Sequence, residues 1–316
     1  MAHRFPLYCA RIDSGGTPPN PNLSRKRYRD MNGIVIVDKP QDWTSQDVTA
    51  RLRRVFNTRR IGHGGTLDPM ATGVLPVFVG RATRGVEFFE HAEKTYETVL
   101  RLGLATDTED VTGTTLTESS VSVTDEQIAA VLDTFRGEIL QIPPMYSALK
   151  VGGQKLCDLA RKGKTVERQP RPITIHELTL LDRGENTLRL RVRCSKGTYI
   201  RTLCKDIGEA LGCGGCMQSL RRVTAGEYTI EEAVPLQELL DTAEPEKYLR
   251  GVDTMFRNYP AVTLTANQEK RCRNGNTFSV KFPDGRYRAY SQSGEFLMLA
   301  QVECGVMSTV KSFFEV

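Results

Sequence analysis

The chain has 316 residues, 39% of them hydrophobic and 26% charged, which is ordinary for a globular protein and long enough for one large domain and a smaller one. Its apolar runs are much shorter than the ~18 residues of a membrane-spanning helix, and the first twelve residues have no apolar segment typical of a secretory signal. The net charge of +5 is concentrated in residues 1–30, which hold six basic residues against two acidic ones, so a nucleic-acid footprint elsewhere would need local clusters.

Eight cysteines are scattered along the chain. Without signs of secretion we expect reduced thiols and a cytoplasmic protein. Cys213 and Cys216 form one Cys-x-x-Cys pair without the second pair of a zinc ribbon, so a polar loop is favoured over a metal or redox site.

Residues 1–30 combine glycine, proline and the basic run 25–27, a composition that buries too little apolar surface to order itself. We therefore expect a flexible basic extension. Ordered structure is expected to begin with a strand in the β-branched run 33–37.

Thr44 or Ser45 is expected to cap the first helix, in which Val48, Leu52 and Val55 form an apolar stripe. Its other faces and the residues after it carry five arginines, at positions 51, 53, 54, 59 and 60. Such a row is either a solvated helix face or a surface that contacts phosphates, and the sequence leaves both open.

The most informative segment is 62–73, in which four glycines and a proline surround one carboxylate, Asp68. Glycine permits positive φ and close approach of a ligand, and Pro69 fixes the turn after the acid. His63 lies five residues upstream. Packing explains a lone acid in such a stiff loop poorly, whereas a flat substrate lying against the backbone explains it well.

The middle of the chain predicts further strands and a helix. Residues 74–79 are an apolar run typical of a buried strand, and alternation from Tyr96 onwards predicts a half-buried strand. Thr124 and Gln127 form a capping box for the next helix. Residues 143–172 are rich in proline, glycine and basic side chains, which predicts a long, mobile and functional excursion.

Apolar residues alternate with three arginines over 188–194, which predicts a strand with one apolar and one basic face. The run 195–201 leads into a helix ended by Gly212. Because a cation at a helix start opposes the helix dipole, Arg201 is expected to have a carboxylate partner. From about residue 258, short strands and turns predict a small β-barrel-like module.

Asp68 is the best candidate for chemistry. It has only His63 near it in sequence, too few ligands for metal-assisted hydrolysis, and residues 80–83 do not match a P-loop. Chemistry with a second carboxylate on a glycoside stays open. The pattern favours one carboxylate acting as nucleophile or base, oriented by a cation, on something planar that meets Tyr96, Tyr199 and His63.

Each of these side chains also has a structural explanation. His63 could be a satisfied loop histidine, and Tyr96 and Tyr199 could be core tyrosines at strand ends. Leu220 has the character of an ordinary buried core residue.

Together these segments closely resemble the bacterial TruB family of tRNA pseudouridine synthases. The segment Gly-Gly-Thr-Leu-Asp-Pro-Met-Ala-Thr-Gly is highly specific, and the other matches are individually moderate. They run in family order, at 33–40, 62–76, 94–97, 144–150, 194–202 and 220–222.

The resemblance implies an α+β pseudouridine synthase fold, with a central, mostly antiparallel mixed sheet flanked by helices. It implies a catalytic domain over 31–250, in which 144–172 is an insert that clamps RNA. Residues 251–316 then form a small β-barrel-like PUA-type domain, and 1–30 precede the family's usual start.

The implied reaction converts the T-loop uridine at tRNA position 55 to pseudouridine. Asp68 matches the essential aspartate, Arg201 the arginine that pairs with it, and Tyr199 the tyrosine that helps remove the C5 proton. The expected substrate-binding residues are His63, Tyr96, Tyr199, Leu220 and Lys39. His63 would hold the T loop with the base flipped out, Tyr96 would stack on the base, and Leu220 would form a wall of the pocket.

We expect no cofactor and no metal, because the sequence offers neither a nucleotide fingerprint nor a metal cluster. The expected partner is the T stem-loop of tRNA, with no membrane and no obligate protein partner, and the protein is expected to be a monomer. Two alternatives stay open: a tRNA-binding folding chaperone with incidental catalysis, and a hydrolase that uses Asp68 on a small glycoside.

Overall fold

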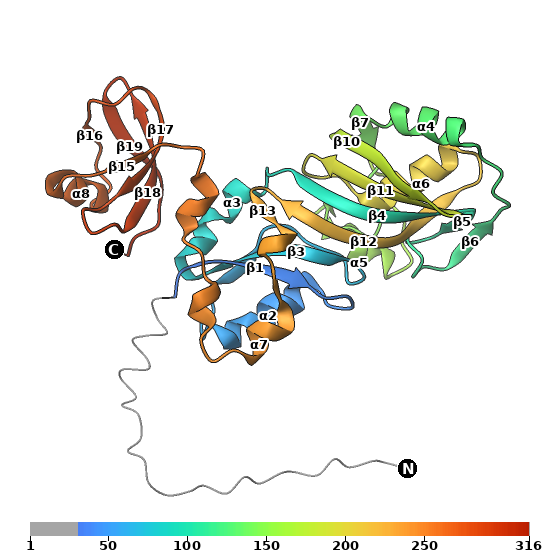
Figure 1. Ribbon diagram of the computed structural model, residues 1–316, viewed down its shortest axis with the longest axis horizontal. Coiled ribbons are helices and arrows are strands. Elements are labelled where there is room, and N and C mark those ends of the chain that lie inside the picture. Colours follow the sequence, from blue (N-terminus) through green and yellow to red (C-terminus); the bar gives the residue numbers. More distant parts are fainter. Residues whose placement is uncertain (1–30, 316) are drawn as a thin grey trace, which may run out of the picture.

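The computed structural model describes residues 31–315, so the predicted N-terminal extension over 1–30 lies outside the described residues. A ten-stranded sheet, in the strand order β14-β1-β3-β12-β4-β11-β10-β7 with β2 and β13 attached, forms the centre of the larger lobe (Figure 1). Its strands are β1 Gly33–Lys39, β2 Ile61–His63, β3 Thr72–Val79, β4 Lys94–Leu102, β7 Gly137–Gln141, β10 Arg171–Arg183, β11 Thr187–Cys194, β12 Gly215–Ala225, β13 Tyr228–Thr229 and β14 Val234–Pro235.

Within this ten-stranded sheet only the pairs β1–β14 and β3–β12 are parallel, so the expected mixed and mostly antiparallel sheet is confirmed. Two small hairpins, β5 Leu104–Thr106 with β6 Thr115–Glu118 and β8 Lys150–Val151 with β9 Gln154–Lys155, lie outside this sheet.

Helices cover one face of the sheet along its length. The helices of this lobe are α2 Ser45–Val55, η1 Gly80–Gly85, α3 Val86–Phe89, α4 Asp125–Thr134, α5 Leu156–Ala160, α6 Ile200–Ala210, η2 Ile230–Glu232, α7 Leu236–Asp241, η3 Pro245–Tyr248 and η4 Val252–Phe256. Apolar side chains of α2, α4, α6 and α7 share one core cluster with one face of the strands. The opposite face of β1 and β3 packs instead against η1 and α3.

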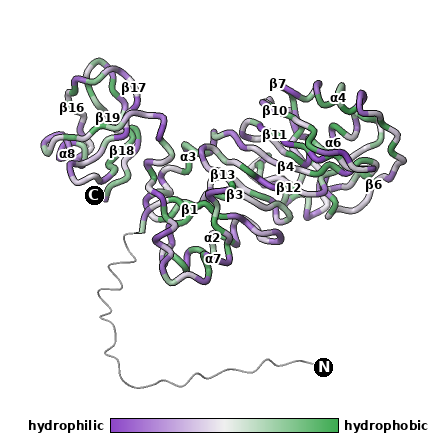
Figure 2. Tube along the Cα trace, viewed as in Figure 1, coloured by the Kyte–Doolittle hydropathy of each residue, from purple (hydrophilic) through white to green (hydrophobic). Residues whose placement is uncertain are grey.

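β1 shows why both faces are covered there. Its residues alternate, with Val35 and Val37 in the first cluster and Ile34 and Ile36 in the second. All four are at most 1% exposed, and the apolar run can be followed in Figure 2. A strand buried on both faces reads as a continuous apolar run, as the sequence predicted here.

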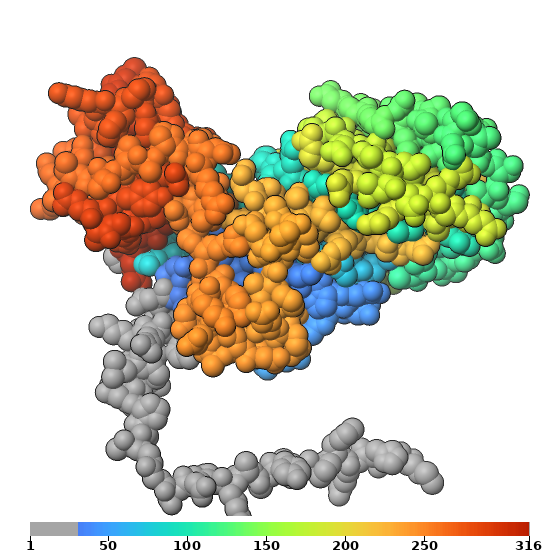
Figure 3. Space-filling model, in the orientation of Figure 1, coloured from blue at the N-terminus to red at the C-terminus, as the bar shows by residue number. Residues whose placement is uncertain are grey.

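A second, five-stranded sheet in the order β15-β17-β18-β19-β16 has its own core in the C-terminal lobe. Its elements are β15 Ala261–Thr263, α8 Ala266–Arg273, β16 Phe278–Ser279, β17 Gly285–Tyr290, β18 Phe296–Glu303 and β19 Val306–Ser312. This lobe contacts the larger one (Figure 3). The contact includes a small aromatic cluster around Phe256 and Phe313 and an ion pair of 2.5 Å between Lys311 and Glu87.

Candidate active site

Asp68 lies in the loop 64–71 between β2 and β3, here called the Asp68 loop. The backbone around Asp68 is held from the start of α2: Leu67 N donates to Ser45 Oγ at 2.8 Å, and Asp42 N donates to Pro69 O at 2.8 Å. Ser45 is buried, whereas the Asp68 side chain is 36% exposed. The loop therefore presents a fixed carboxylate to solvent.

Arg201 is the cation that orients this carboxylate. Its Nε lies 2.9 Å from Asp68 Oδ2, and its Nη2 lies 3.4 Å from Asp68 Oδ1. The remaining donors bond to Tyr146 O at 2.8 Å and Thr108 O at 3.1 Å, and only 7% of the side chain is exposed. Asp68 is therefore the carboxylate partner that the position of Arg201 predicted, and four contacts leave the guanidinium little freedom.

Lys39 lies under the Asp68 loop and does not face its open side. Its ammonium donates to the carbonyls of Trp43 at 2.5 Å, Pro40 at 2.9 Å and Pro69 at 3.1 Å, and the side chain is fully buried. Burial lowers the pKa of Lys39 to about 8, against the attraction of Asp68. These contacts indicate that Lys39 positions the loop. They fit the expected direct contact with substrate less well.

Arg222 was not among the predicted site residues, although its motif at 220–222 was noted. It is 1% exposed, and it donates to Val74 O at 2.7 Å and Gly65 O at 3.1 Å. It stands opposite Tyr96 in the pairing of β12 with β4. Two adjacent arginines within β12 were the available signal, but the sequence does not say which of them faces inwards.

Burial and Arg222 also set the protonation of the neighbouring side chains. Burial lowers the pKa of His63 and Arg222 lowers it further, which favours a neutral imidazole, and its Nδ1 is buried without a hydrogen-bond partner among residues 31–315. Burial raises the pKa of the Tyr96 phenol, while Arg222 opposes that shift. The same two causes lower the pKa of Lys94 to about 8.

Tyr96 and Leu220 come together as expected, because β4 and β12 are adjacent. Tyr96 is 9% exposed and Leu220 is 7% exposed, and both belong to the core cluster that contains Leu67, the residue before Asp68. Arg222, which pairs with Tyr96 and follows Leu220 by two residues, bonds Gly65 O, so this end of β4 and β12 lies beside the Asp68 loop.

Tyr199 is the N-cap residue of α6, two residues before Arg201. Its N–H donates to Gln141 Oε1 at 2.8 Å and its carbonyl accepts from Gln141 Nε2 at 3.1 Å. Gln141, which is 2% exposed, thus fixes the backbone that carries Tyr199, and no pattern in the sequence indicates this role.

The predicted excursion over 143–172 contains the β8–β9 hairpin and α5. Tyr146, in its first turn, supplies one of the carbonyls bonded to Arg201, and Arg168 Nη1 donates to Pro143 O at 3.1 Å across its base. The insert is therefore tied to the Asp68–Arg201 pair.

The two predicted basic surfaces differ. On β11, Arg189 and Arg191 both pair with Glu97 at 2.7 Å, and Arg193 pairs with Glu93 at 2.8 Å. In contrast, the arginines at 51, 53, 54, 59 and 60 form no ion pair with any residue of 31–315. Within the described residues, the charge of the second row is therefore not neutralised by carboxylates.

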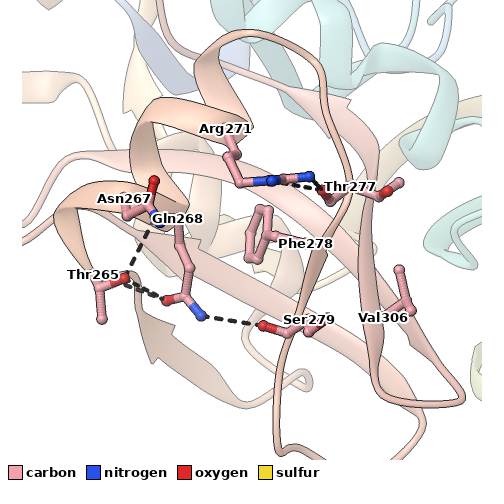
Figure 4. Close-up of a pocket in the computed structure, with 8 residues that line it drawn as sticks. All are labelled: Thr265, Asn267, Gln268, Arg271, Thr277, Phe278, Ser279 and Val306. Carbon is pink, nitrogen blue, oxygen red and sulfur yellow. Dashed lines mark hydrogen bonds between the residues drawn. The ribbon is translucent and has the colours of Figure 1, made fainter.

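Other candidate sites carry less chemistry. A cavity of about 440 Å³ between α8, β16 and β19 is lined by polar groups that bond to one another, such as Arg271 to Thr277 O and Gln268 to Ser279 O (Figure 4). Cys213 lies in the turn between α6 and β12, as the predicted loop implies, but Cys216 lies within β12, and the two residues are only 7% and 0% exposed.

Among residues 31–315, no group of three or more His, Cys, Asp or Glu side chains is placed to hold a metal ion. No helix in this part of the chain is long and apolar enough to cross a membrane.

Known proteins resemble the chain in sequence and in structure. The family model for the TruB family pseudouridylate synthase N-terminal domain matches residues 53–200, and that for the tRNA pseudouridylate synthase B C-terminal domain matches 201–253. Proteins named tRNA pseudouridine synthase B from Escherichia coli strain K12 and Shigella flexneri serotype 5b are each 43% identical over 294 residues, which cover 88% of this chain and 94% of theirs.

Among solved structures, a chain of a Cbf5-Nop10-Gar1 complex superposes with a TM-score of 0.69 at 24% identity, covering 92% of this chain and 87% of that one. A chain of an H/ACA RNP bound to a substrate RNA containing 2′-deoxyuridine gives a TM-score of 0.68 at 22% identity, covering 95% and 92%. These two likenesses concern the fold.

Proposed function

The chain belongs to the TruB family of pseudouridylate synthases, and we propose that it converts the T-loop uridine at tRNA position 55 to pseudouridine, with Asp68 as the essential carboxylate. The enzyme is a tRNA pseudouridine synthase, as its relatives of nearly the same length are named. The observation that carries the assignment of Asp68 is its ion pair with buried Arg201 in a loop open to solvent.

The reaction is an isomerisation. The bond between N1 of uracil and C1′ of ribose breaks, a bond between C5 and C1′ forms, C5 loses a proton and N1 gains one. Atoms and electrons balance within the nucleotide, so no co-reactant is required. One well-placed carboxylate, acting as a nucleophile on the ribose or on the base, suits this chemistry.

Other side chains around the loop take the remaining roles. A base inside a folded loop can be reached only after it leaves its stack, and an aromatic face such as Tyr96 offsets part of that cost, roughly 1–3 kcal/mol per stacked base. His63 holds the opened T loop, and Leu220 closes one wall of the pocket. Tyr199 lies two residues before Arg201, and Gln141 holds its backbone. Its side chain helps remove the C5 proton.

Carbodiimide treatment followed by primer extension on an unmodified T stem-loop RNA tests this proposal, because the adduct on pseudouridine stops the polymerase. We expect a stop at position 55 with the wild type. Asp68→Asn should lower the rate by at least about a thousandfold while changing RNA affinity less than about twofold, since it removes the reacting group alone. Asp42→Asn, at a positive-φ position that Asn tolerates, is the matched control and should stay active.

A wild type that binds the RNA but gives no stop would refute the proposal and favour the tRNA-binding folding chaperone. Release of free uracil without a stop would favour the hydrolase. A stop that survives in Asp68→Asn would remove the carboxylate from the mechanism.

We also propose the following organisation. Residues 31–250 form the catalytic domain, the insert 144–172 closes over the RNA stem-loop, and residues 251–316 form the PUA-type domain. The protein acts in the cytoplasm as a monomer without an obligate protein partner, and light scattering at assay concentrations tests the oligomeric state.

A further inference from the structure

The Arg201 guanidinium is aimed partly by the carbonyl of Thr108, which accepts from Nη1 at 3.1 Å. Thr108 lies in the segment 107–114 that joins β5 to β6, and this segment contacts α6 through Glu109. What fixes this segment therefore also fixes Arg201, and through it Asp68.

Glu109, the next residue, has an unusual backbone. Its φ is +65°, one of only four positive values at non-glycine residues within 31–315. Glycine adopts this conformation without the steric cost that a β-carbon adds. A glutamate at such a position suggests that its side chain contributes something that glycine could not.

The Glu109 carboxylate ties the segment to α6. Thr202 Oγ1 donates to Glu109 Oε2 at 2.5 Å, and Lys205 Nζ lies 3.7 Å from Glu109 Oε1. Thr202 follows Arg201 directly and is 2% exposed, and only 12% of the Glu109 side chain is exposed. The first turn of α6 has no acidic residue of its own, so Glu109 also supplies the negative charge that a helix start favours.

The backbone of Glu109 is held from the other side, because its carbonyl accepts from Met217 N of β12 at 3.0 Å. The residue is therefore fixed between the sheet and α6. Its neighbour Thr108 is held so that its carbonyl points at the Arg201 guanidinium.

We propose that Glu109 is a positioning residue for the reaction: by bonding Thr202 it holds the Thr108 carbonyl against Arg201 and so orients the Asp68 carboxylate. This inference rests on the proposed function, because its effect is read as a rate of pseudouridine formation. Its contacts are with Thr202, Lys205 and Met217, so it acts on Asp68 only through Thr108 and Arg201.

Single-turnover rates, RNA affinity and thermal midpoints of a variant series test the inference. Glu109→Gly removes the side chain and relieves the positive φ, so it should melt higher than Glu109→Ala and yet form pseudouridine about tenfold more slowly than the wild type. RNA affinity should change less than about twofold. Glu109→Gln, whose Oε1 can still accept from Thr202, should recover most of the rate.

Glu209→Gln is the matched control, since Glu209 also lies 3.7 Å from Lys205 but is 60% exposed and lies on α6 itself. It should keep the wild-type rate. Thr202→Val removes the other partner, and combined with Glu109→Gly it should slow the reaction no more than either change alone.

Wild-type rates in Glu109→Gly and Thr202→Val would overturn the inference. So would a rate in Glu109→Gly that falls only as far as the folded fraction falls. Absence of pseudouridine with the wild type would count against the proposed function instead.

Discussion

Two charged side chains, Lys39 and Arg222, lie buried beneath the Asp68 loop on either side of its acid. Lys39 donates to Pro69 O, and Arg222 donates to Gly65 O. Each serves the loop by bonding its backbone, because a short loop has no hydrogen-bond ladder of its own to satisfy its carbonyls. The conformation of the Asp68 loop therefore depends on two buried cations as well as on its glycines.

The buried ammonium of Lys39 should make stability depend on pH. Its pKa falls from about 10.5 in the unfolded chain to about 8 in the folded protein, so between these values the unfolded chain binds more protons. The free energy of unfolding of the wild type, relative to Lys39→Met, should therefore rise by roughly 3 kcal/mol from pH 7 to pH 11. Urea unfolding of both proteins across this range measures it, and a constant difference would contradict the assigned cause.

The site residues that could be predicted are those that stand out in the sequence pattern itself. Asp68 stood out because a stiff small-residue loop isolates it, and Arg201 because it opens a helix that its charge disfavours. Gln141 and Arg222 did not stand out, because their importance arises from partners more than 50 residues away. Lys39 entered the prediction through family resemblance, which gave the residue but not its buried, loop-facing orientation.

At the scale of elements, the parallel pairing of β3 with β12 places the site at the centre of the sheet. This pairing brings Gly73 beside Arg222, and Gly73 has a φ of +101°. A β-carbon there would lie 2.2 Å from Arg222 O, which is backbone and cannot move aside cheaply. Gly73 therefore permits the strand that carries Arg222 to approach the Asp68 loop.

Three glycine-to-alanine changes should separate the free-energy cost of a strained backbone from that of steric overlap. Gly73→Ala meets both the strained backbone and the overlap and should lose roughly 3 kcal/mol or more of stability. Gly197→Ala has a φ of +80° but open space and should lose about 1 kcal/mol. Gly62→Ala, with neither strain nor a contact closer than 3.7 Å, should stay within roughly 0.5 kcal/mol. Urea unfolding gives the order, and a Gly73→Ala variant as stable as Gly62→Ala would contradict this explanation.

Helices with a capping box and an apolar stripe were predictable from sequence. Thr44 and Thr124 are the N-caps of α2 and α4, each with the reciprocal bond from the third helical residue. α8 has the same kind of cap, Thr265 with Gln268, but was not predicted. Only Cys272 of this helix is buried, so the apolar periodicity that would mark a helix is missing.

At the scale of the whole molecule, net charge says little about where RNA binds. The described part of the chain is nearly neutral, and the β11 arginines form ion pairs with Glu97 and Glu93. The unpaired arginines lie on and after α2, the helix whose first residue, Ser45, bonds the Asp68 loop. Of the two arginine rows, the α2 row is therefore the better candidate for contacts with RNA phosphates.

The salt dependence of RNA affinity tests this distinction. Each phosphate contact releases counterions and steepens the fall of log K with log salt by roughly 0.7–0.9. Replacing Arg51, Arg54 and Arg59 with Ala, all exposed and without an ion-pair partner within the described chain, should flatten the slope by roughly two to three units if all three bind phosphates. The matched triple replacement of Arg189, Arg191 and Arg193 with Ala should change it by less than one unit, because those guanidinium groups already have carboxylate partners. Titrations of a labelled T stem-loop RNA between about 50 and 200 mM salt measure both slopes. The reverse order would mean that the RNA displaces Glu97 and Glu93 from their arginines, and that the open face of β4 and β11 is the surface that receives the RNA backbone.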